Sequence, residues 1–219
     1  MKDLIIIGAG NLGREVAQMV RDINMDGREW NFLGFIDETP QKQGAIINKD
    51  PVLGGFEWLE KQHSSGICAV CAIGNPKGKY TVVQKAKEYD LCFTNLIHPN
   101  VAINEFIEMG TGNIICWNTF ISVNTRIGSF VTINPGCGIG HDTAIGDYTT
   151  LYWDVTLSGN VSIGEGCEIG SKAAVIPKRS VGGWSILGAG AVVIRDIPER
   201  CTAVGMPAKP IKFHSNDFI

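Results

Sequence analysis

The 219-residue sequence lacks any apolar run long enough to cross a bilayer, because stretches such as residues 67–73 are far shorter than the roughly 20 residues required. The N-terminus has no signal-peptide pattern, since its first three residues lead directly into a strand-like run. A net charge of −3 provides no general attraction to nucleic acid or to a membrane surface. We therefore expect a soluble, cytoplasmic protein without nucleic-acid or membrane partners.

The sequence also lacks the signs of a disulfide framework. Its seven cysteines are an odd number, and no secretory signal precedes them. Cys68 and Cys71 have CxxC spacing, but they lie in an apolar strand-like run without a second pair. Residues three apart on a strand point to opposite faces, so we interpret both as buried apolar side chains and expect no metal.

Glycine is abundant, with 27 residues, which indicates many tight turns. Charge is distributed unevenly along the chain. Residues 1–169 contain 12 Lys and Arg against 19 Asp and Glu, whereas residues 170–219 contain seven against three. A polyanionic small molecule would therefore be attracted to the C-terminal part.

The first part of the sequence has the pattern of a nucleotide-binding α/β unit. A strand is predicted over residues 2–7 and a helix over 14–24, joined by a loop with Gly8, Gly10 and Gly13. Small residues at this place let the backbone approach a phosphate, and the helix N-terminus supplies unpaired N–H groups. The next predicted strand, 32–36, ends at Asp37, where such folds contact a ribose or base.

A third predicted strand, 67–73, leads into a loop with Gly74 and Asn75 and a helix over 79–89. The pattern ends near residue 97, whereas an NAD-dependent dehydrogenase needs two such halves. We therefore predict a Rossmann-like domain over residues 1–97 that binds one nucleotide or a nucleotide-linked sugar. The alternative is that the glycines only allow tight packing of strand against helix.

The second part of the sequence has a six-residue repeat that neither a helix nor a strand period explains. In eight of the sixteen repeats the aliphatic residue is followed by glycine. The aliphatic positions are Ile103, Met109, Ile115, Ile121, Ile127, Ile133, Ile139, Ile145, Leu151, Leu157, Ile163, Ile169, Val175, Val181, Leu187 and Val193.

This repeat predicts a triangular prism over residues 98–198, followed by a tail over 199–219. Each hexapeptide forms one short strand with its aliphatic side chain buried, and the glycine relieves the backbone at the corner. Three hexapeptides close a coil, so residue i lies beneath residue i+18 at a strand spacing of roughly 4.8 Å. The flat faces of such a prism favour self-association.

The repeat segments around residues 138–147, 158–164, 188–193 and 204–209 resemble hexapeptide-repeat acyltransferases. Together with GAGNLGREV and GFIDE, they resemble the sugar O/N-acetyltransferases of the sialic-acid O-acetyltransferase type, which are similar to bacillosamine- and perosamine-pathway N-acetyltransferases. The resemblance covers nearly the whole chain. It implies a left-handed parallel β-helix, acetyl-CoA as acyl donor, and a homotrimer with active sites between prisms.

Acyl transfer needs a base for the acceptor proton and donors for the developing oxyanion. His141 follows Ile139 and Gly140 at a predicted corner, so its ring should project outward. The resemblance assigns His141 as the general base and Asp142 as its orienting partner. The other histidines fit structural or solvated positions better: His63, His98 and His214.

One coil above His141 the register places Gly159, whose backbone leaves room for a thioester and could donate an N–H to its carbonyl. The resemblance implies coenzyme contacts at Gly159, at Ser171 and at Ala189, which stands at a family glycine position. It also marks Asn134 as a residue near the acceptor.

The sequence departs from the family pattern at Thr150, where some members have a second histidine. Tyr152 and Trp153 make this segment aromatic, which fits either a ring to stack on or contacts between copies. The acceptor atom, an amine or a hydroxyl, stays open at this point.

The sequence therefore predicts an acetyl-CoA-dependent acetyltransferase that acts on a nucleotide-linked or sialic-acid-like sugar. One alternative is a serine or other small-acceptor acetyltransferase, against which the nucleotide-binding unit argues. The other is a non-catalytic β-helix protein that binds a nucleotide-sugar, against which the His141–Asp142 pair beneath Gly159 argues.

Overall fold

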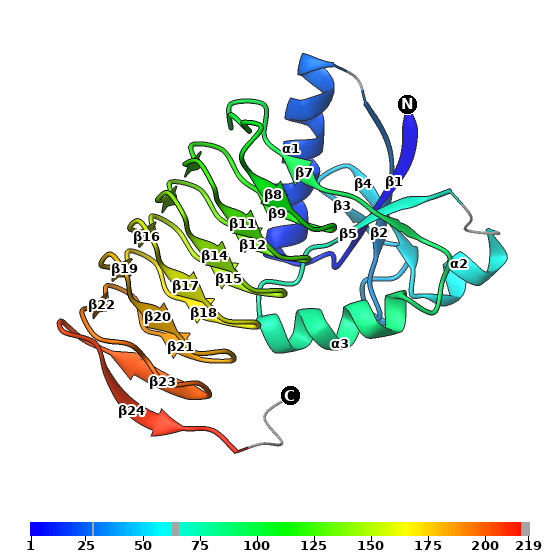
Figure 1. The fold of residues 1–219 in the computed structure, drawn as a ribbon. Coiled ribbons are helices and arrows are strands. Elements are labelled where there is room, and N and C mark those ends of the chain that lie inside the picture. Colours follow the sequence, from blue (N-terminus) through cyan, green and yellow to red (C-terminus); the bar gives the residue numbers. More distant parts are fainter. Residues whose placement is uncertain (28, 63–65, 216–219) are drawn as a thin grey trace.

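The computed structural model describes residues 1–27, 29–62 and 66–215, which form an α/β part and a long parallel β-solenoid (Figure 1). Three strands and two helices lie close to their predicted positions, and no described helix is long and apolar enough to cross a membrane. The α/β elements are β1 (Lys2–Ile7), α1 (Asn11–Asp26), β2 (Trp30–Ile36), β3 (Ile46–Ile47), β4 (Asp50–Gly54), α2 (Glu57–Lys61), β5 (Cys68–Cys71), α3 (Pro76–Ala86) and β6 (Cys92–Phe93).

The α/β part is built on one sheet with the strand order β3-β4-β2-β1-β5-β6. Only the β3–β4 pair is antiparallel. Residues 4–7 of β1 are buried on both faces, which explains their continuous apolar run. The carboxyl ends of β1, β2 and β5 meet at one edge of the sheet, where the glycine loop, Asp37 and the loop before α3 begin.

The solenoid has three sheets, which we call I, II and III in the order in which each complete coil passes through them. Sheet I contains β7 (Leu96–Ile97), β9 (Ile114–Ile115), β12 (Thr132–Ile133), β15 (Thr150–Leu151), β18 (Glu168–Ile169), β21 (Ile186–Leu187), β23 (Cys201–Val204) and β24 (Lys209–Phe213). Sheet II contains β10 (Phe120–Ile121), β13 (Gly138–Ile139), β16 (Thr156–Leu157), β19 (Ala174–Val175) and β22 (Val192–Val193). Sheet III contains β8 (Glu108–Met109), β11 (Arg126–Ile127), β14 (Ala144–Ile145), β17 (Ser162–Ile163) and β20 (Ser180–Val181).

The fold class predicted from the repeat is confirmed, including the register of 18 residues. Ile121 pairs with Ile139, which pairs in turn with Leu157. The inward aliphatic side chains are buried from Ile115 onward. The predicted burial of Ile103 is wrong: this residue is 40% exposed, because it precedes the first regular coil and no strand pairs with β10 from below.

The turns at the corners follow a strict rule. Every sixth residue from 112 to 190 has a left-handed backbone, with φ between +56° and +78°. These residues stand three positions after each inward aliphatic, and Asp142 is one of them. Asparagine, aspartate and glycine tolerate this conformation best and occupy most of the corners.

The predicted reason for the glycines that follow the aliphatics is therefore wrong. None of these eight glycines has a positive φ. At seven of them an added Cβ would fall 2.3–2.9 Å from a backbone nitrogen of the next coil, so glycine is required by close stacking rather than by the turn. The glycines are Gly110, Gly128, Gly140, Gly146, Gly164, Gly170, Gly182 and Gly188.

The two ends of the solenoid differ from the predicted domain limits in detail. β7 pairs with β9, so sheet I already begins at residues 96–97. At the other end, β23 extends sheet I and β24 folds back on it antiparallel, within the predicted tail. The domain boundaries themselves stay predictions.

The α/β part packs on sheet I and on the corner between sheets III and I. The Tyr80 ring of α3 lies edge-on to the rings of Tyr148 and Trp184, with centroids 5.1 Å and 5.8 Å away. In a triangular prism the corner between sheets II and III is opposite sheet I. That corner is therefore on the far side of the solenoid from the α/β part (Figure 1).

The stacking rule gives a direct prediction. A Cβ at Gly146 would lie 2.5 Å from the Glu165 backbone nitrogen, so we expect Gly146→Ala to lower the free energy of unfolding by about 1–3 kcal/mol. Gly27→Ala is the control, because no atom lies within 4 Å of its added Cβ. Equilibrium urea unfolding measures both, and equal stabilities of the two variants would contradict the rule.

Candidate active site

The three glycines of the first loop have three different roles. Gly8 has φ +105°, which other residues rarely adopt, and an added Cβ at Gly13 would lie 2.0 Å from the Gly8 carbonyl oxygen. Gly13 thus lets α1 pack closely on β1. Gly10 has no atom within 4 Å of its added Cβ and precedes the first residue of α1. Of the three, Gly10 leaves open space at a helix N-terminus, as a phosphate site requires.

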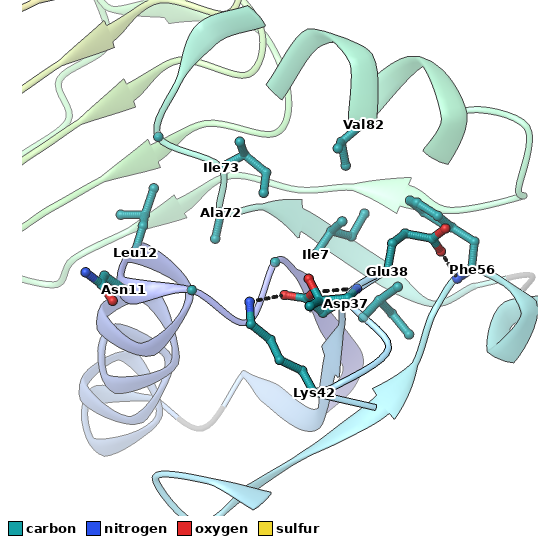
Figure 2. A pocket seen from close by; sticks show the side chains of 15 residues that line it. Ile7, Asn11, Leu12, Asp37, Glu38, Lys42, Phe56, Ala72, Ile73 and Val82 are labelled. Carbon is teal, nitrogen blue, oxygen red and sulfur yellow. Dashed lines mark hydrogen bonds and ion pairs between the residues drawn. The ribbon is translucent and has the colours of Figure 1, made fainter. Parts of the chain in front are cut away.

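A cavity of about 390 Å³ lies at this edge of the sheet. Gly8 and Gly10 line it together with the first turn of α1, the end of β2 and the loop after β5, which includes Gly74 (Figure 2). Its walls combine apolar side chains with two carboxylates, Asp37 and Glu38, and one lysine. The site predicted for a nucleotide is thus a real cavity, while the binding roles stay predictions.

Asp37 holds the glycine loop in place. Its carboxylate accepts hydrogen bonds from the Ala9 N–H at 2.8 Å, the Thr39 N–H at 2.9 Å and Lys42 Nζ at 2.9 Å. Burial raises the pKa of this carboxyl, but the hydrogen bonds outweigh burial and lower the pKa to about 2. Asp37 is thus engaged by the protein itself at the position predicted to meet a ribose or base.

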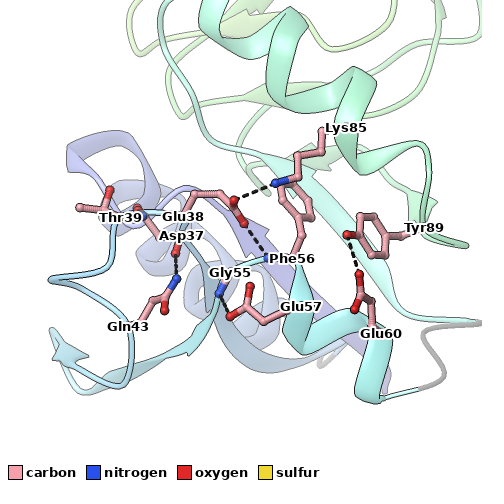
Figure 3. A network of polar contacts seen from close by, with 10 residues as sticks. All are labelled: Asp37, Glu38, Thr39, Gln43, Gly55, Phe56, Glu57, Glu60, Lys85 and Tyr89. Carbon is pink, nitrogen blue, oxygen red and sulfur yellow. Dashed lines mark hydrogen bonds and ion pairs between the residues drawn. The ribbon is translucent and has the colours of Figure 1, made fainter.

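The sequence analysis did not single out Glu38, the other carboxylate of the cavity. Its two oxygens accept from the Phe56 N–H at 2.7 Å and from Lys85 Nζ at 2.7 Å, so it joins β2 to the start of α2 and to α3 (Figure 3). Hydrogen bonds from Lys85 and Phe56 lower the pKa of Glu38. The acidic pair directly after β2 was a visible signal for this residue.

The loop with Gly74 and Asn75 contacts the solenoid directly. The Thr150 hydroxyl donates to the Gly74 carbonyl at 2.7 Å, and Asn75 Nδ2 lies 3.2 Å from Glu168 Oε2. Asn75 Oδ1 accepts from the Gly78 N–H and so caps α3. These two residues therefore link the loop at the edge of the cavity to sheet I.

Glu168 and Tyr152 continue this polar surface on the solenoid. The Tyr152 hydroxyl donates to Glu168 Oε1 at 3.1 Å. Burial and the Glu168 carboxylate raise the pKa of Tyr152 to about 12, so the hydroxyl keeps its proton. The surface beside Asn75 thus contains both a carboxylate and a phenol.

His141 and Asp142 lie at the corner between sheets II and III. His141 Nδ1 is 2.7 Å from Asp142 Oδ2, and both side chains are largely exposed, at 57% and 44%. Hydrogen bonds with His141 and Asn124 lower the pKa of Asp142. A carboxylate only accepts, so the proton of a neutral His141 resides on Nδ1 and Nε2 carries the lone pair.

Gly159 lies against the His141 ring, as the register predicted. An added Cβ there would lie 2.5 Å from His141 Nε2, so any other residue would cover this nitrogen. The Asn160 N–H donates to the His141 carbonyl at 2.8 Å and fixes the two coils to each other. This arrangement leaves Nε2 accessible to an external proton donor.

The remaining predicted residues lie at another corner, between sheets I and II. Ser171 and Ala189 stand in successive coils there, and the Gly190 N–H donates to the Ser171 carbonyl at 2.8 Å. Asn134 is at the same corner, but it is buried and donates its amide to the Leu151 carbonyl at 2.8 Å. One chain therefore does not bring these three residues together with His141.

Known proteins are similar to the α/β part and to the whole chain. Residues 3–86 match the family described as PglD N-terminal domain. The perosamine N-acetyltransferase of Caulobacter crescentus, solved with CoA and GDP-perosamine as a histidine variant, has 27% identity and a TM-score of 0.89 over 97% of this chain and 98% of its own. The PglB acetyltransferase domain of Neisseria gonorrhoeae FA1090 with acetyl coenzyme A has 26% identity and a TM-score of 0.86 over 96% and 99%.

The α/β part therefore matches the PglD N-terminal domain family, and the whole chain shares its fold with these two solved acetyltransferases. A curated protein of Schizosaccharomyces pombe, provisionally named an acetyltransferase, is 51% identical over 43 residues. The chain spans only about a fifth of that relative's length, as 21% of it is aligned.

The other histidines have structural contacts or lie outside the described residues. His98 Nδ1 is 2.8 Å from Asn100 Oδ1, and His214 Nε2 is 3.0 Å from Thr202 Oγ1. His63 is outside the residues that the structure describes. Among those residues, no group of three His, Cys, Asp or Glu side chains could hold a metal ion.

The sequence analysis missed one unusual residue of this chain. Lys79 on α3 is 1% exposed, and its Nζ makes hydrogen bonds to three oxygens of the solenoid. The buried stripe of α3 consists of Pro76, Lys79, Val83 and Ala86, with helical spacing. A lysine within an otherwise apolar stripe was the signal that could have revealed it.

The role of Asp37 predicts a defined dependence of stability on pH. Because its folded pKa is lowered to about 2, its contribution is complete above pH 4 and is lost as the pH falls toward 2. We expect Asp37→Asn to cost up to about 2 kcal/mol at neutral pH and progressively less in acid.

Urea unfolding of wild type and variant between pH 7 and pH 3 measures this difference. Asp90→Asn, at an exposed carboxyl, is the control and should change little. A constant difference between wild type and Asp37→Asn over this pH range would contradict the assignment.

Proposed function

We propose that the protein transfers an acetyl group from acetyl-CoA to the amino or hydroxyl group of a nucleotide-linked sugar, with His141 as general base. The observation that carries the proposal is the His141 ring, with Nδ1 held by Asp142 and Nε2 open beside Gly159. The solved perosamine enzyme of Caulobacter crescentus is an N-acetyltransferase, which favours an amine as the acceptor. It has also been solved as variants of a histidine, in agreement with a central imidazole.

The proposed reaction needs only groups that this geometry supplies. His141 Nε2 accepts the proton of the acceptor amine or hydroxyl as its nitrogen or oxygen attacks the thioester carbonyl carbon. The oxyanion formed accepts a hydrogen bond from a backbone N–H, for which we propose Gly159. The C–S bond then breaks, and the proton on His141 passes to the leaving CoA thiolate. Asp142 stabilises the imidazolium between these steps.

The two substrates would approach from different directions. The nucleotide occupies the cavity beside Gly10, with Gly8, Asp37 and Gly74 at its walls, and Asn75 follows directly after Gly74. We place the coenzyme along Gly159 of one chain and along Ser171 and Ala189 of a neighbouring chain, at the other corner of sheet II. A further cavity of about 260 Å³, with Arg195 and Lys209 in its lining, lies near the C-terminal end and suits the coenzyme phosphates.

We further propose that the active site forms between copies in a homotrimer. His141 stands at the corner opposite sheet I, whereas the nucleotide cavity adjoins sheet I through Gly74 and Asn75. A sugar bound in one chain's cavity would therefore meet the base of a neighbouring chain. Asn134, Ser171 and Ala189 lie on the same side of that composite site as the cavity.

Sheet II has the surface that such an assembly requires. Its five outward strand residues are all uncharged, whereas sheet III presents Glu108 and Arg126. Large exposed apolar side chains gather on sheet II and its two corners, an arrangement typical of an interface between copies. They include Phe120, Val123, Trp153, Ile176 and Ile194.

Loss of the base gives the main prediction. We expect His141→Ala to lower turnover by about 10²–10⁴-fold, with acetyl-CoA affinity almost unchanged, since backbone donors and basic residues hold the coenzyme. Asp142→Asn should be milder, because the base remains with a weaker orienting partner. Steady-state kinetics with a nucleotide-linked amino sugar provide the measurement. Turnover of His141→Ala above about a tenth of wild type would assign the proton transfer to another group.

The nucleotide cavity gives a second prediction. Because Gly10 faces open space, Gly10→Trp should fill the cavity without disturbing the fold and should abolish binding of the nucleotide-linked sugar. Titration calorimetry measures binding, and gel filtration checks that the assembly is intact. Unchanged affinity in a correctly assembled variant would place the nucleotide elsewhere.

A further inference from the structure

Lys79 is a buried amine without an acidic partner among its contacts. Its Nζ lies 3.0 Å from the Phe130 carbonyl oxygen, 2.9 Å from Thr132 Oγ1 and 3.0 Å from Thr150 Oγ1. Burial lowers the pKa of Lys79 to about 7. An apolar side chain could fill this place on α3 without the cost of removing an amine from water, so packing alone does not explain a lysine here.

The three oxygens can satisfy both protonation states of this amine. The ammonium form donates to all three oxygens. The neutral form donates to the Phe130 carbonyl and to Thr150, and it accepts from the Thr132 hydroxyl. The contacts therefore persist on either side of neutrality, and no buried polar group of the set is left without a partner.

Thr150 connects Lys79 to the wall of the cavity through a second hydrogen bond. Its hydroxyl donates to the Gly74 carbonyl at 2.7 Å, so its oxygen is available to accept from Lys79. Gly74 lines the cavity, and the next residue, Asn75, contacts Glu168. A continuous path of hydrogen bonds thus runs from Lys79 through Thr150 to the cavity wall.

The contacts of Lys79 also fix its position along the solenoid axis, which we call its height. Thr132 and Thr150 are paired residues of adjacent coils, so Nζ touches two coils at once. Thr132 lies in the same 18-residue coil as His141, nine residues earlier. In a ring whose axis is parallel to the solenoid, that coil has the same height in every copy.

We propose that Lys79 is a positioning residue. It fixes the height of residues 72–75, the loop at the edge of the acceptor cavity, relative to the coil that carries His141. This inference rests on the proposed function, because it assumes that the acceptor spans from the cavity to His141. A displacement of about 1 Å between reacting groups can lower a rate about 100-fold. One coil corresponds to roughly 4.8 Å, so the height of the loop is decisive.

The test uses Lys79→Met, which keeps the length of the side chain but removes its donors. Thr150→Val breaks the same path with little change in shape, in case Lys79→Met folds poorly, and Thr150→Ser should restore it. Lys87→Met is the control, because Lys87 Nζ lies outside the path through Thr150: it is 3.4 Å from Tyr148 Oη and 5.6 Å from the centroid of the Phe130 ring. Hydrogen exchange of residues 72–75, affinity for GDP and UDP, and kinetics of acetyl transfer are measured for each variant.

We expect faster exchange of residues 72–75 in Lys79→Met and Thr150→Val, and turnover lowered by about tenfold or more at saturating acceptor. Affinity of either variant for whichever nucleotide binds wild type should change less than about twofold, because the rest of the cavity is intact. Thr150→Ser and Lys87→Met should behave like wild type. A merely stabilising role would lower the melting temperature but leave turnover of the folded enzyme unchanged.

Wild-type turnover and loop exchange in both Lys79→Met and Thr150→Val would overturn the inference. Absence of acetyl transfer by wild type to any nucleotide-linked sugar would instead overturn the proposed function. In that case the exchange of residues 72–75 still decides the inference, since unchanged exchange in both variants rules out the path through Thr150.

Discussion

The stacking of each coil on the next, 18 residues further along the chain, is the constraint on which the remaining structure depends. It requires glycine where the backbone of the next coil is too close for a Cβ, as at Gly140 and Gly146. It also sets a left-handed residue at every corner, including Asp142. The same stacking presses Gly159 against His141, so the geometry of the proposed base follows from the register of the solenoid rather than from a flexible loop.

A second consequence of the triangular solenoid is that His141 and the cavity of the α/β part lie on opposite sides of one chain. The α/β part occupies sheet I, while His141 projects from the opposite corner of the prism. Each chain then offers the proposed nucleotide cavity on one side and the proposed base on the other. Association through the uncharged sheet II would combine these halves, and Lys79 would set their relative height. The exposed apolar residues around sheet II and the exposed imidazole of His141 thus have a common explanation.

Most of the architecture could be predicted because the repeat is periodic and each coil obeys the same local rules. The sequence also placed Gly159 over His141 by counting 18 residues. Predictions from the sequence were wrong where the role of a residue depends on contacts between coils. The glycines after the aliphatics avoid a collision with the next coil, and Ile103 is exposed because no strand pairs there. Lys79 and Glu38 were missed because their partners are distant in sequence, so no local pattern shows that these charged side chains are enclosed or paired.

Co-expression of two inactive variants tests the shared active site most directly. A His141→Ala chain keeps the cavity, and a Gly10→Trp chain keeps the base, so a mixed assembly contains interfaces that combine both intact halves. With random mixing in equal amounts, about a quarter of the interfaces should be of this kind, and activity should return to about that fraction of wild type. Activity no higher than that of the two variants expressed separately would show that base and cavity belong to one chain.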